Sequence, residues 1–277
     1  MPQEVDRALE NYTRQIIYNN LERLKELSKN TVLCINPGNK KLYVAKKMPL
    51  SAGLGLKRLL HHENGHIPKI LWVEENGADN TAEVVTEYVA GTVLSELIKN
   101  GRTLEAERAL EILGDVAKGL TELHRMGLIH RDVTPKNIII VPGGNAVLID
   151  FGIIRAFDGG KSSDTQILGT PGYAAPEQFG FTESDSRTDI YACGVLLNVL
   201  LTGKLPGEAV PEGKAGRIIK KCTEIDASKR YDDINALLQD IDRDFRKIYR
   251  KWWFWVIIIC AFSLVYYWLE CLGIIPG

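Results

Sequence analysis

In the N-terminal third of the chain, apolar and polar residues alternate with a period of two in several short runs. This alternation is typical of half-buried β-strands. The predicted strands cover residues 31–35, 42–48, 67–74 and 83–88. Residues 21–27 fit a further strand, although their charges also allow a helix. Asn36-Pro37-Gly38-Asn39 is a turn signal between two of these strands.

Helical spacing predicts one helix over residues 51–60 and another over residues 3–20. The N-terminal helix carries apolar residues on one side, namely Val5, Leu9, Tyr12, Ile16 and Ile17. We expect this helix to pack on the small sheet. A surface for a partner protein is the alternative interpretation.

Beyond residue 90 the apolar residues recur every three or four positions, which favours helices. The expected helices are a short one over 94–99, a long one that begins at Thr103, and three more over 190–201, 214–222 and 231–248. One hairpin interrupts them, with strands over 138–141 and 146–149 around the turn Pro142-Gly143-Gly144-Asn145.

The C-terminal run 252–269 contains no charged residue and has tryptophan and tyrosine at both ends. As a helix it would be about 27 Å long, close to the hydrocarbon thickness of a bilayer. Basic residues precede the run and none follows it, which predicts a membrane-spanning helix with residues 1–251 on the cytoplasmic side. Residues 270–277 would then form a short extracytoplasmic tail. A buried or an interfacial helix is the alternative.

Composition adds few constraints. The chain has 277 residues, 45% of them hydrophobic, and a formal net charge of −1, so no basic field indicates nucleic acid as a partner. The five cysteines form no metal-spaced cluster, which favours a reducing cytosol for the region before the run. Residues 1–30 are polar and charged and predict no signal peptide.

The candidate chemistry lies on either side of the hairpin. The string His130-Arg131-Asp132-Val133-Thr134-Pro135-Lys136-Asn137 precedes it, and Asp150-Phe151-Gly152 follows it. A hairpin brings its entry and its exit to the same end, so Asn137 and Asp150 should lie close together. Their oxygens suit Mg²⁺, and Asp132 could accept a proton from an attacking hydroxyl.

These strings resemble those of the eukaryotic-type protein kinases, a family also found in bacteria, and the resemblance covers roughly residues 21–245. It implies an α+β fold of two lobes, with a β-rich small lobe and hinge over 21–91 and a helical large lobe over 92–248. The N-terminal helical extension would cover residues 1–20. It also implies ATP and Mg²⁺ as cofactors, with Mn²⁺ as a substitute, and a protein as the phosphoryl acceptor.

The resemblance assigns roles within the large lobe. Asp132 would orient the substrate hydroxyl and Thr170 would hydrogen-bond Asp132, while Asn137 and Asp150 would hold the metal. Arg131 would steady the activation segment, His130 would be a packed structural residue, and Asp189 would hold the backbone of the catalytic loop. Glu177, at the end of the string Gly169-Thr170-Pro171-Gly172-Tyr173-Ala174-Ala175-Pro176-Glu177, would pair with Arg230.

In the small lobe, the resemblance makes Lys46 the contact of the ATP phosphates, with Lys47 as the alternative. Val44 or Ala45 would cover the adenine, Thr86 would be the gatekeeper, and the backbones of Glu87 and Val89 would bind the adenine edge. Ser162, Ser163 and Thr165 lie in the polar middle of the activation segment and are candidate phosphorylation sites.

Three departures from the family pattern stand out. Thr134 replaces the usual lysine two residues after Asp132, and Lys136 is a candidate for its charge or else a solvated lysine. No glycine-rich loop precedes Val32, where Lys29 could compensate. No acidic residue lies between Met48 and His62 to pair with the strand lysine, and Glu63 comes too late, so Asp150 could hold that lysine instead.

These features favour a membrane-anchored serine/threonine protein kinase, and two copies could associate through the membrane helix. The alternative is a pseudokinase scaffold that binds nucleotide or partner proteins at the membrane. A small-molecule kinase of related fold fits less well, because the strings at Glu177 and Asp189 build a protein-substrate platform.

Overall fold

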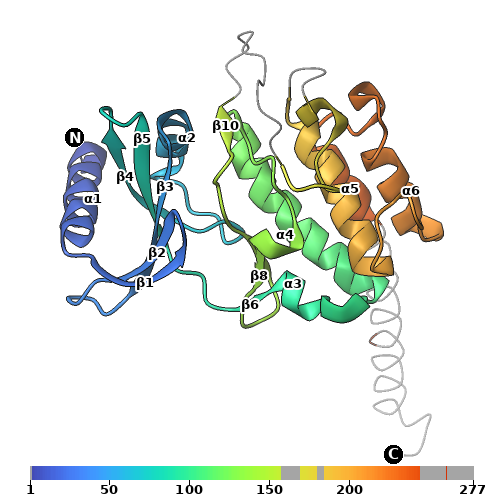
Figure 1. The fold of residues 1–277 in the computed structure, drawn as a ribbon, viewed down its shortest axis with the longest axis horizontal. Coiled ribbons are helices and arrows are strands. Elements are labelled where there is room, and N and C mark those ends of the chain that lie inside the picture. The colour runs from blue at the N-terminus through green and yellow to red at the C-terminus, as the bar shows by residue number, and fades with distance from the viewer. Residues whose placement is uncertain (1, 157–168, 180–183, 244–259, 261–277) are drawn as a thin grey trace, which may run out of the picture. The chain divides into compact units, whose positions relative to one another are not determined.

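The structure is a computed structural model that describes residues 2–156, 169–179, 184–243 and 260, with side chains from residue 9 onward. The chain divides into two units, Met1–Leu237 and Leu238–Gly277. The first unit contains a small sheet with helices followed by a helical lobe (Figure 1). This arrangement confirms the predicted α+β fold with a β-rich small lobe and a helical large lobe.

The small lobe is built on a five-stranded antiparallel sheet in the order β1-β2-β3-β5-β4. Its strands are β1 (Glu22–Ser28), β2 (Thr31–Ile35), β3 (Leu42–Pro49), β4 (Ile70–Asn76) and β5 (Thr81–Glu87). Residues 21–27 are therefore a strand and the helical alternative was wrong. Strand β4 begins three residues later than predicted, because Ile67 closes a turn onto Asn64 and Pro68 has no N–H to donate.

The period-two pattern of the strands separates the two faces of this sheet. Tyr43, Ala45 and Val85 belong to one buried cluster, against which Ile17 and Tyr18 of α1 (Pro2–Asn19) pack. The other face carries α2 (Leu50–Leu56), which approaches so closely that a Cβ at Gly53 would lie 2.4 Å from the Cβ of Ala82. Only glycine permits that approach. A short 3₁₀ turn, η1 (Lys57–Leu59), completes the predicted helix.

Helix α1 packs on the sheet as expected, and Ile17 of the predicted side takes part, but three other residues of that side do not. Leu9 and Tyr12 are each 63% exposed and Ile16 is 44% exposed, whereas the Arg14 side chain is buried. Arg14 donates a hydrogen bond to the carbonyl of Leu60 and pairs with Glu10. The helix therefore packs through Ile17 and Tyr18 near its C-terminus and through the buried guanidinium of Arg14.

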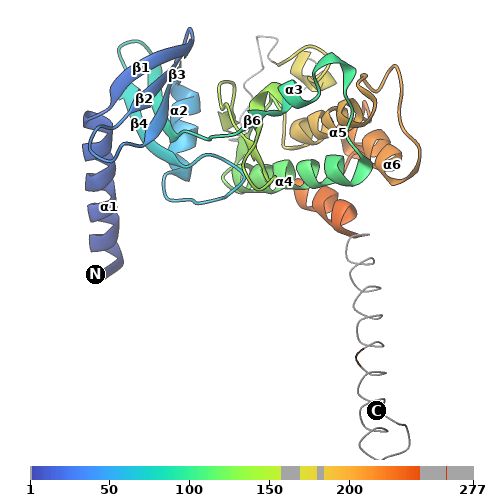
Figure 2. The same ribbon diagram turned by 90° about the horizontal axis from the view of Figure 1, so that it is seen from below.

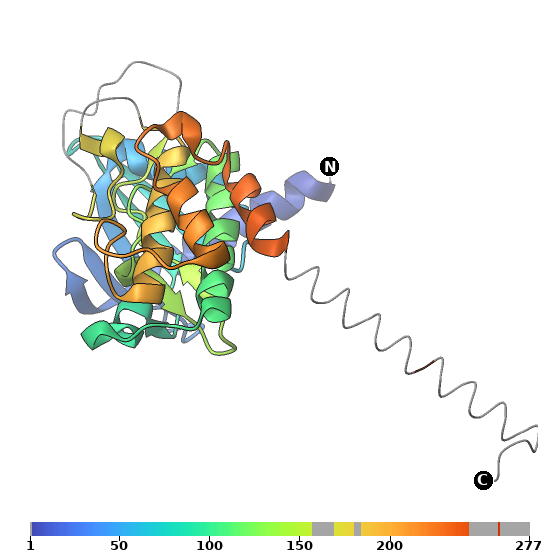
Figure 3. The ribbon, with the colours of Figure 1, turned by 90° about the vertical axis from the view of Figure 1, so that its right-hand side faces the viewer.

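The large lobe contains α4 and α5, packed against each other, with α6 against α5 (Figures 1 and 2). In Figure 3 these helices lie in front of the small sheet. The helices are α3 (Leu94–Leu97), α4 (Ala106–Arg125), α5 (Arg187–Thr202) and α6 (Gly213–Cys222), with 3₁₀ turns η2 (Lys99–Gly101), η3 (Pro135–Asn137), η4 (Pro176–Phe179) and η5 (Ala227–Lys229). Short strands are β6 (Thr92–Val93), β7 (Leu128–Ile129), β8 (Ile138–Ile140), β9 (Ala146–Leu148) and β10 (Arg155–Ala156).

Helix α4 begins three residues after Thr103, because the Leu104 amide donates to the carbonyl of Leu200 on α5 at 2.8 Å. Helix α5 ends where predicted, at Gly203 in the left-handed conformation with φ of 69°. Residues 234–237 are helical at the end of the first unit, and the Asp233 side chain caps this helix by accepting from the Ala236 amide at 2.8 Å.

In the second unit, residues 238–243 are helical. Within the part of the chain that the structure describes, no helix combines the length and the apolar character needed to span a bilayer. The run 252–269, apart from Cys260, and the tail 270–277 lie outside the described residues, as does the predicted end of the large lobe at residue 248.

Candidate active site

The loop after β7 is held by one buried carboxylate. Asp189, near the N-terminus of α5, is fully buried and accepts hydrogen bonds from the backbone amides of His130 at 2.9 Å and Arg131 at 2.7 Å. These bonds keep Arg131 at φ of 69°, a left-handed conformation that is costly for a side chain with a Cβ. Burial raises the pKa of Asp189, but the hydrogen bond and charge of His124, 2.8 Å away, help to bring it below its usual value.

His130 is a neutral structural residue. Its Nε2 lies 3.2 Å from the carbonyl oxygen of Ile149, which can only accept, and its Nδ1 accepts from the Asp132 amide at 3.3 Å. These partners select the tautomer with the proton on Nε2. Burial lowers the pKa of His130 because the charged form would lose its hydration. The ring also packs edge-on against Phe151, with centroids 5.8 Å apart.

The Asp132 side chain is positioned by residues on both sides. The Thr170 hydroxyl donates to Oδ1 at 2.6 Å, and the Asn137 amide nitrogen donates to Oδ2 at 2.7 Å. Lys136 lies 3.5 Å from Oδ2, with its own side chain 56% exposed. A carboxylate fixed at both oxygens keeps one orientation toward an incoming hydroxyl.

Asn137 and Asp150 come together as the hairpin predicts. Strands β8 and β9 pair Ile138 with Leu148, and the Ile149 amide donates to the Asn137 carbonyl at 2.7 Å. Both amide protons of Asn137 point toward Asp132, to its backbone oxygen at 2.9 Å and to its carboxylate. The carboxamide oxygen of Asn137 is thus the end left for a cation, and with a carboxylate oxygen of Asp150 it offers the hard ligands that Mg²⁺ prefers.

Of the two strand lysines, Lys46 reaches Asp150. It forms an ion pair with Oδ1 of Asp150, an atom that also accepts from the Gly152 amide at 2.9 Å. Lys47 points to Asp79, 3.5 Å away, and is half-exposed. Burial raises the pKa of Asp150, but the charge and hydrogen bond of Lys46, together with the hydrogen bond of the Gly152 amide, help to lower it overall.

The α2 helix carries no acidic residue that could take Lys46 from Asp150. Glu63, the first acidic residue after the helix, pairs instead with Lys69. Lys46 therefore pairs with Asp150, the carboxylate that would hold the metal. The sequence suggested this pair in place of one with a helix glutamate. In this conformation Asp150 balances the lysine charge through Oδ1.

An apolar cavity of ≈ 310 Å³ lies beside Lys46. Val44 and Leu27 line it from the small sheet, Ile139 and Ile149 line it from the large lobe, and the hinge from Thr86 to Val89 closes one side. Within the described chain the backbone amide of Val89 has no acceptor, which leaves a donor for a heterocyclic base. Ala45 is buried in the cluster under α1 and does not line the cavity, so Val44 is the residue that faces it.

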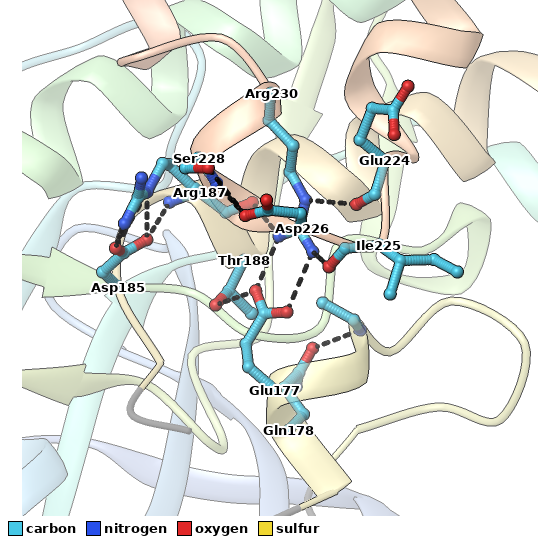
Figure 4. A network of polar contacts seen from close by, with 11 residues as sticks. Glu177, Gln178, Asp185, Arg187, Thr188, Glu224, Ile225, Asp226, Ser228 and Arg230 are labelled. Carbon is cyan, nitrogen blue, oxygen red and sulfur yellow. Dashed lines mark hydrogen bonds and ion pairs between the residues drawn. The ribbon is translucent and has the colours of Figure 1, made fainter. Parts of the chain in front are cut away.

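A second ion pair anchors the segment that follows Thr170 (Figure 4). Arg230 has no exposed side-chain surface and forms two hydrogen bonds with the Glu177 carboxylate, at 2.7 and 2.9 Å. The Thr188 hydroxyl donates to the same carboxylate at 2.9 Å. Arg230 also donates to the backbone oxygens of Glu224 at 2.8 Å and Arg187 at 3.0 Å. Burial raises the pKa of Glu177, but the hydrogen bond of Arg230 contributes to a net lowering.

Residues 30–253 match the family model described as the protein kinase domain. The chain belongs to the protein kinase family. A probable serine/threonine-protein kinase of Streptomyces coelicolor is 37% identical over 147 residues, which are 50% of this chain and 22% of that protein. A probable serine/threonine-protein kinase of Clostridium acetobutylicum is 30% identical over 197 residues, which are 62% of this chain and 30% of that protein. The serine/threonine-protein kinase PknL of Mycobacterium tuberculosis is 40% identical over 124 residues, which are 44% of this chain and 31% of that protein. The chain thus spans less than a third of the length of these relatives.

The kinase-like site also uses residues that the sequence did not single out. Gln178 donates to the Arg131 carbonyl at 3.0 Å and accepts from the Ala175 amide at 2.9 Å, so it ties the activation segment to the catalytic loop. His124 follows the apolar positions Leu120 and Leu123 of α4, and this placement was the one available signal for a histidine whose side chain is 9% exposed. Thr188 and Gln178 gave no such signal, because the contacts of Thr188 with Glu177 and of Gln178 with Arg131 join different segments of the chain.

Ser162, Ser163 and Thr165 lie outside the described residues, so their phosphorylation stays a prediction. The Arg131 side chain, expected to steady that segment, is buried. Thr134 is buried as well, and Lys29 is not among the residues that line the cavities beside Lys46.

Proposed function

We propose that this protein is an ATP-dependent serine/threonine protein kinase. The observation that carries the proposal is the arrangement around Asp132, whose two carboxylate oxygens accept from Thr170 and Asn137. An apolar cavity of a size suited to a purine adjoins Lys46 and Asp150. Phosphoryl transfer requires positioning and charge neutralisation, and these residue types supply both.

In this proposal the adenine binds against Val44 and the hinge, where Glu87 and Val89 offer backbone groups. Lys46 binds the phosphates, and Asp132 orients the acceptor hydroxyl for in-line attack. Lys136, close to Asp132, adds a positive charge near the terminal phosphate where Thr134 supplies none. Mg²⁺ or Mn²⁺, when bound by Asn137 and Asp150, would neutralise charge on the phosphates.

We predict that the full-length chain incorporates phosphate from MgATP labelled at the γ position. Mass spectrometry should locate the phosphate on Ser162, Ser163 or Thr165, because a phosphorylated side chain there would gain the charge of Arg131. The triple variant Ser162→Ala, Ser163→Ala, Thr165→Ala is the control for the sites. It should lose this labelling and keep its activity toward an added protein. Binding of ATP with no transfer to any protein would contradict the proposal.

That negative result would favour the second candidate, a pseudokinase scaffold. The specific observation behind it is the Lys46–Asp150 ion pair, together with a helix α2 that lacks an acidic residue. In this conformation Lys46, needed for the phosphates, and Asp150, needed for the metal, neutralise each other.

We propose further that residues 252–269 anchor the kinase in the cell membrane as a single span, with the kinase region in the cytoplasm. Support comes from the uncharged run itself and from the basic residues that precede it. Two copies could associate through the same segment.

The expected result is that the full-length chain stays with membranes after alkaline carbonate extraction. The double variant Ile258→Arg, Phe262→Arg should be released, because each arginine at the centre of a span costs about 2.5–3.5 kcal/mol. Ile274→Arg with Ile275→Arg makes the same change outside the run and should remain bound. Extraction of the unmodified chain by carbonate would refute the anchor.

A further inference from the structure

The connection between β1 and β2 is a two-residue turn. Ser28 pairs with Thr31 across the hairpin, which leaves only Lys29 and Asn30 in the turn. The carbonyl of Asn30 accepts a hydrogen bond from the Lys47 amide at 2.8 Å. The turn is therefore tied to β3 directly beside Lys46. In most protein kinases the backbone amides of a longer glycine-rich loop cover the phosphates here, and so short a turn cannot offer them in the same way.

Asn30 faces the place where phosphates would lie. It lines a polar cavity of ≈ 680 Å³ together with Lys46, Asp132 and Asp150. This cavity and the apolar cavity share Lys46, Met48 and Asp150 in their linings, so the two adjoin each other. A nucleotide with its base in the apolar cavity would extend its phosphates past Lys46 into the polar one, toward Asp132.

The Asn30 side chain is suited to bind there. Among the residues that the structure describes, its carboxamide has no hydrogen-bond partner, so its two N–H groups are available. The Lys47 contact fixes its backbone, which lowers the entropy lost on binding. Lys29, the other residue of the turn, is not among the residues that line the cavity.

We propose that Asn30 binds the nucleotide phosphates through its side-chain amide and so replaces the missing glycine-rich loop. The inference rests on the proposed function, because it assumes that ATP occupies these cavities. Asn30 then positions the terminal phosphate from the small lobe, while Asp132 faces it from the catalytic loop of the large lobe.

The test compares two variants that place an aspartate in the same turn, Asn30→Asp and Lys29→Asp, in the full-length chain. Binding of MgATP and of adenosine is measured by calorimetry. For Asn30→Asp we expect the Kd for MgATP to rise about tenfold or more, since a donor to a charged group is replaced by a like charge. The Kd for adenosine should change less than about twofold, because adenosine has no phosphate.

Lys29→Asp changes the charge of the turn more than Asn30→Asp does. It should nevertheless raise the Kd for MgATP by less than about threefold if direct contact with the phosphates, rather than the net charge of the turn, determines affinity. Asn30→Ala should lie between the unmodified chain and Asn30→Asp. An equal loss of adenosine and MgATP binding in Asn30→Asp, or a larger effect from Lys29→Asp, would overturn the assignment. Failure of the unmodified chain to bind either ligand would instead refute the proposed function itself.

Discussion

Replacement of Asp132 by asparagine is expected to lower kcat for phosphoryl transfer by roughly 10²–10⁴-fold, the contribution typical of a positioned general base. Asparagine keeps the shape of the side chain, and its oxygen can still accept from Thr170 or Asn137, which now contact the two carboxylate oxygens. It cannot take the proton of the acceptor hydroxyl. Steady-state kinetics with an added protein substrate measures kcat, and calorimetry should show that the Kd for MgATP changes less than about threefold.

Asp79→Asn is the matched control, because Asp79 lines the same polar cavity but pairs with Lys47 and makes no contact with Asp132 among the described residues. It should leave kcat within about twofold. Lys136→Ala is the graded companion: loss of a half-exposed charge 3.5 Å from Asp132 should lower kcat about tenfold at nearly unchanged affinity. If Asp132→Asn retains more than a tenth of the activity of the unmodified chain, Asp132 is not the general base.

The parts of the site that the sequence could predict are those set by local geometry. Asn137 and Asp150 converge because they stand at the two ends of one short hairpin, so the turn alone brings them together. The same holds for Val44 and Lys46, which share a face of β3 by the period of a strand. Motif order along the chain then indicated the kinase fold before any contact was known.

The remaining parts depend on contacts between segments far apart in the sequence. Alternation places Lys46 and Lys47 on opposite faces, but only the packing of α2 and α1 on those faces decides which lysine meets Asp150. The apolar side of α1 is a similar case, because Leu9, Tyr12 and Ile16 are exposed whereas the polar Arg14 is buried. Asn30 gave no signal, since its position follows from the length of a turn and its bond to Lys47.

Electrostatics explains why a chain with these departures still keeps an organised site. Asp150, Asp189 and Glu177 each have a pKa below the usual value despite burial, because a cation or backbone amides face each carboxylate. The three carboxylates hold, in turn, Lys46, the catalytic loop and the activation segment. The loss of the helix acid therefore removes one anchor of Lys46 while the large lobe keeps its own.

Removal of the guanidinium in Arg230→Met is expected to lower the free energy of unfolding by roughly 3–5 kcal/mol, the usual cost of leaving one member of a buried ion pair without its partner. The Glu177 side chain is 6% exposed and that of Arg230 is 0% exposed, so water cannot replace the lost bonds. For a unit of this size the melting temperature should fall by roughly 6–20 °C. Arg187→Met is the control, because its pair with Asp185 is about one third exposed and such pairs contribute about 0–1 kcal/mol.

The pH dependence supplies a second measurement on the same pair. The pKa of Glu177 is lower in the folded protein than its ordinary value of 4.5, so the folded state holds the charged form more tightly than the unfolded chain does. The stabilisation is therefore complete above pH 4.5 and is lost as the pH falls through the folded pKa. In Glu177→Met with Arg230→Met, neither charge is left alone, and stability should recover in part and lose this acid dependence. A double variant less stable than both single variants would show that Thr188 and the backbone oxygens around Arg230, rather than the charge pair, hold the activation segment in place.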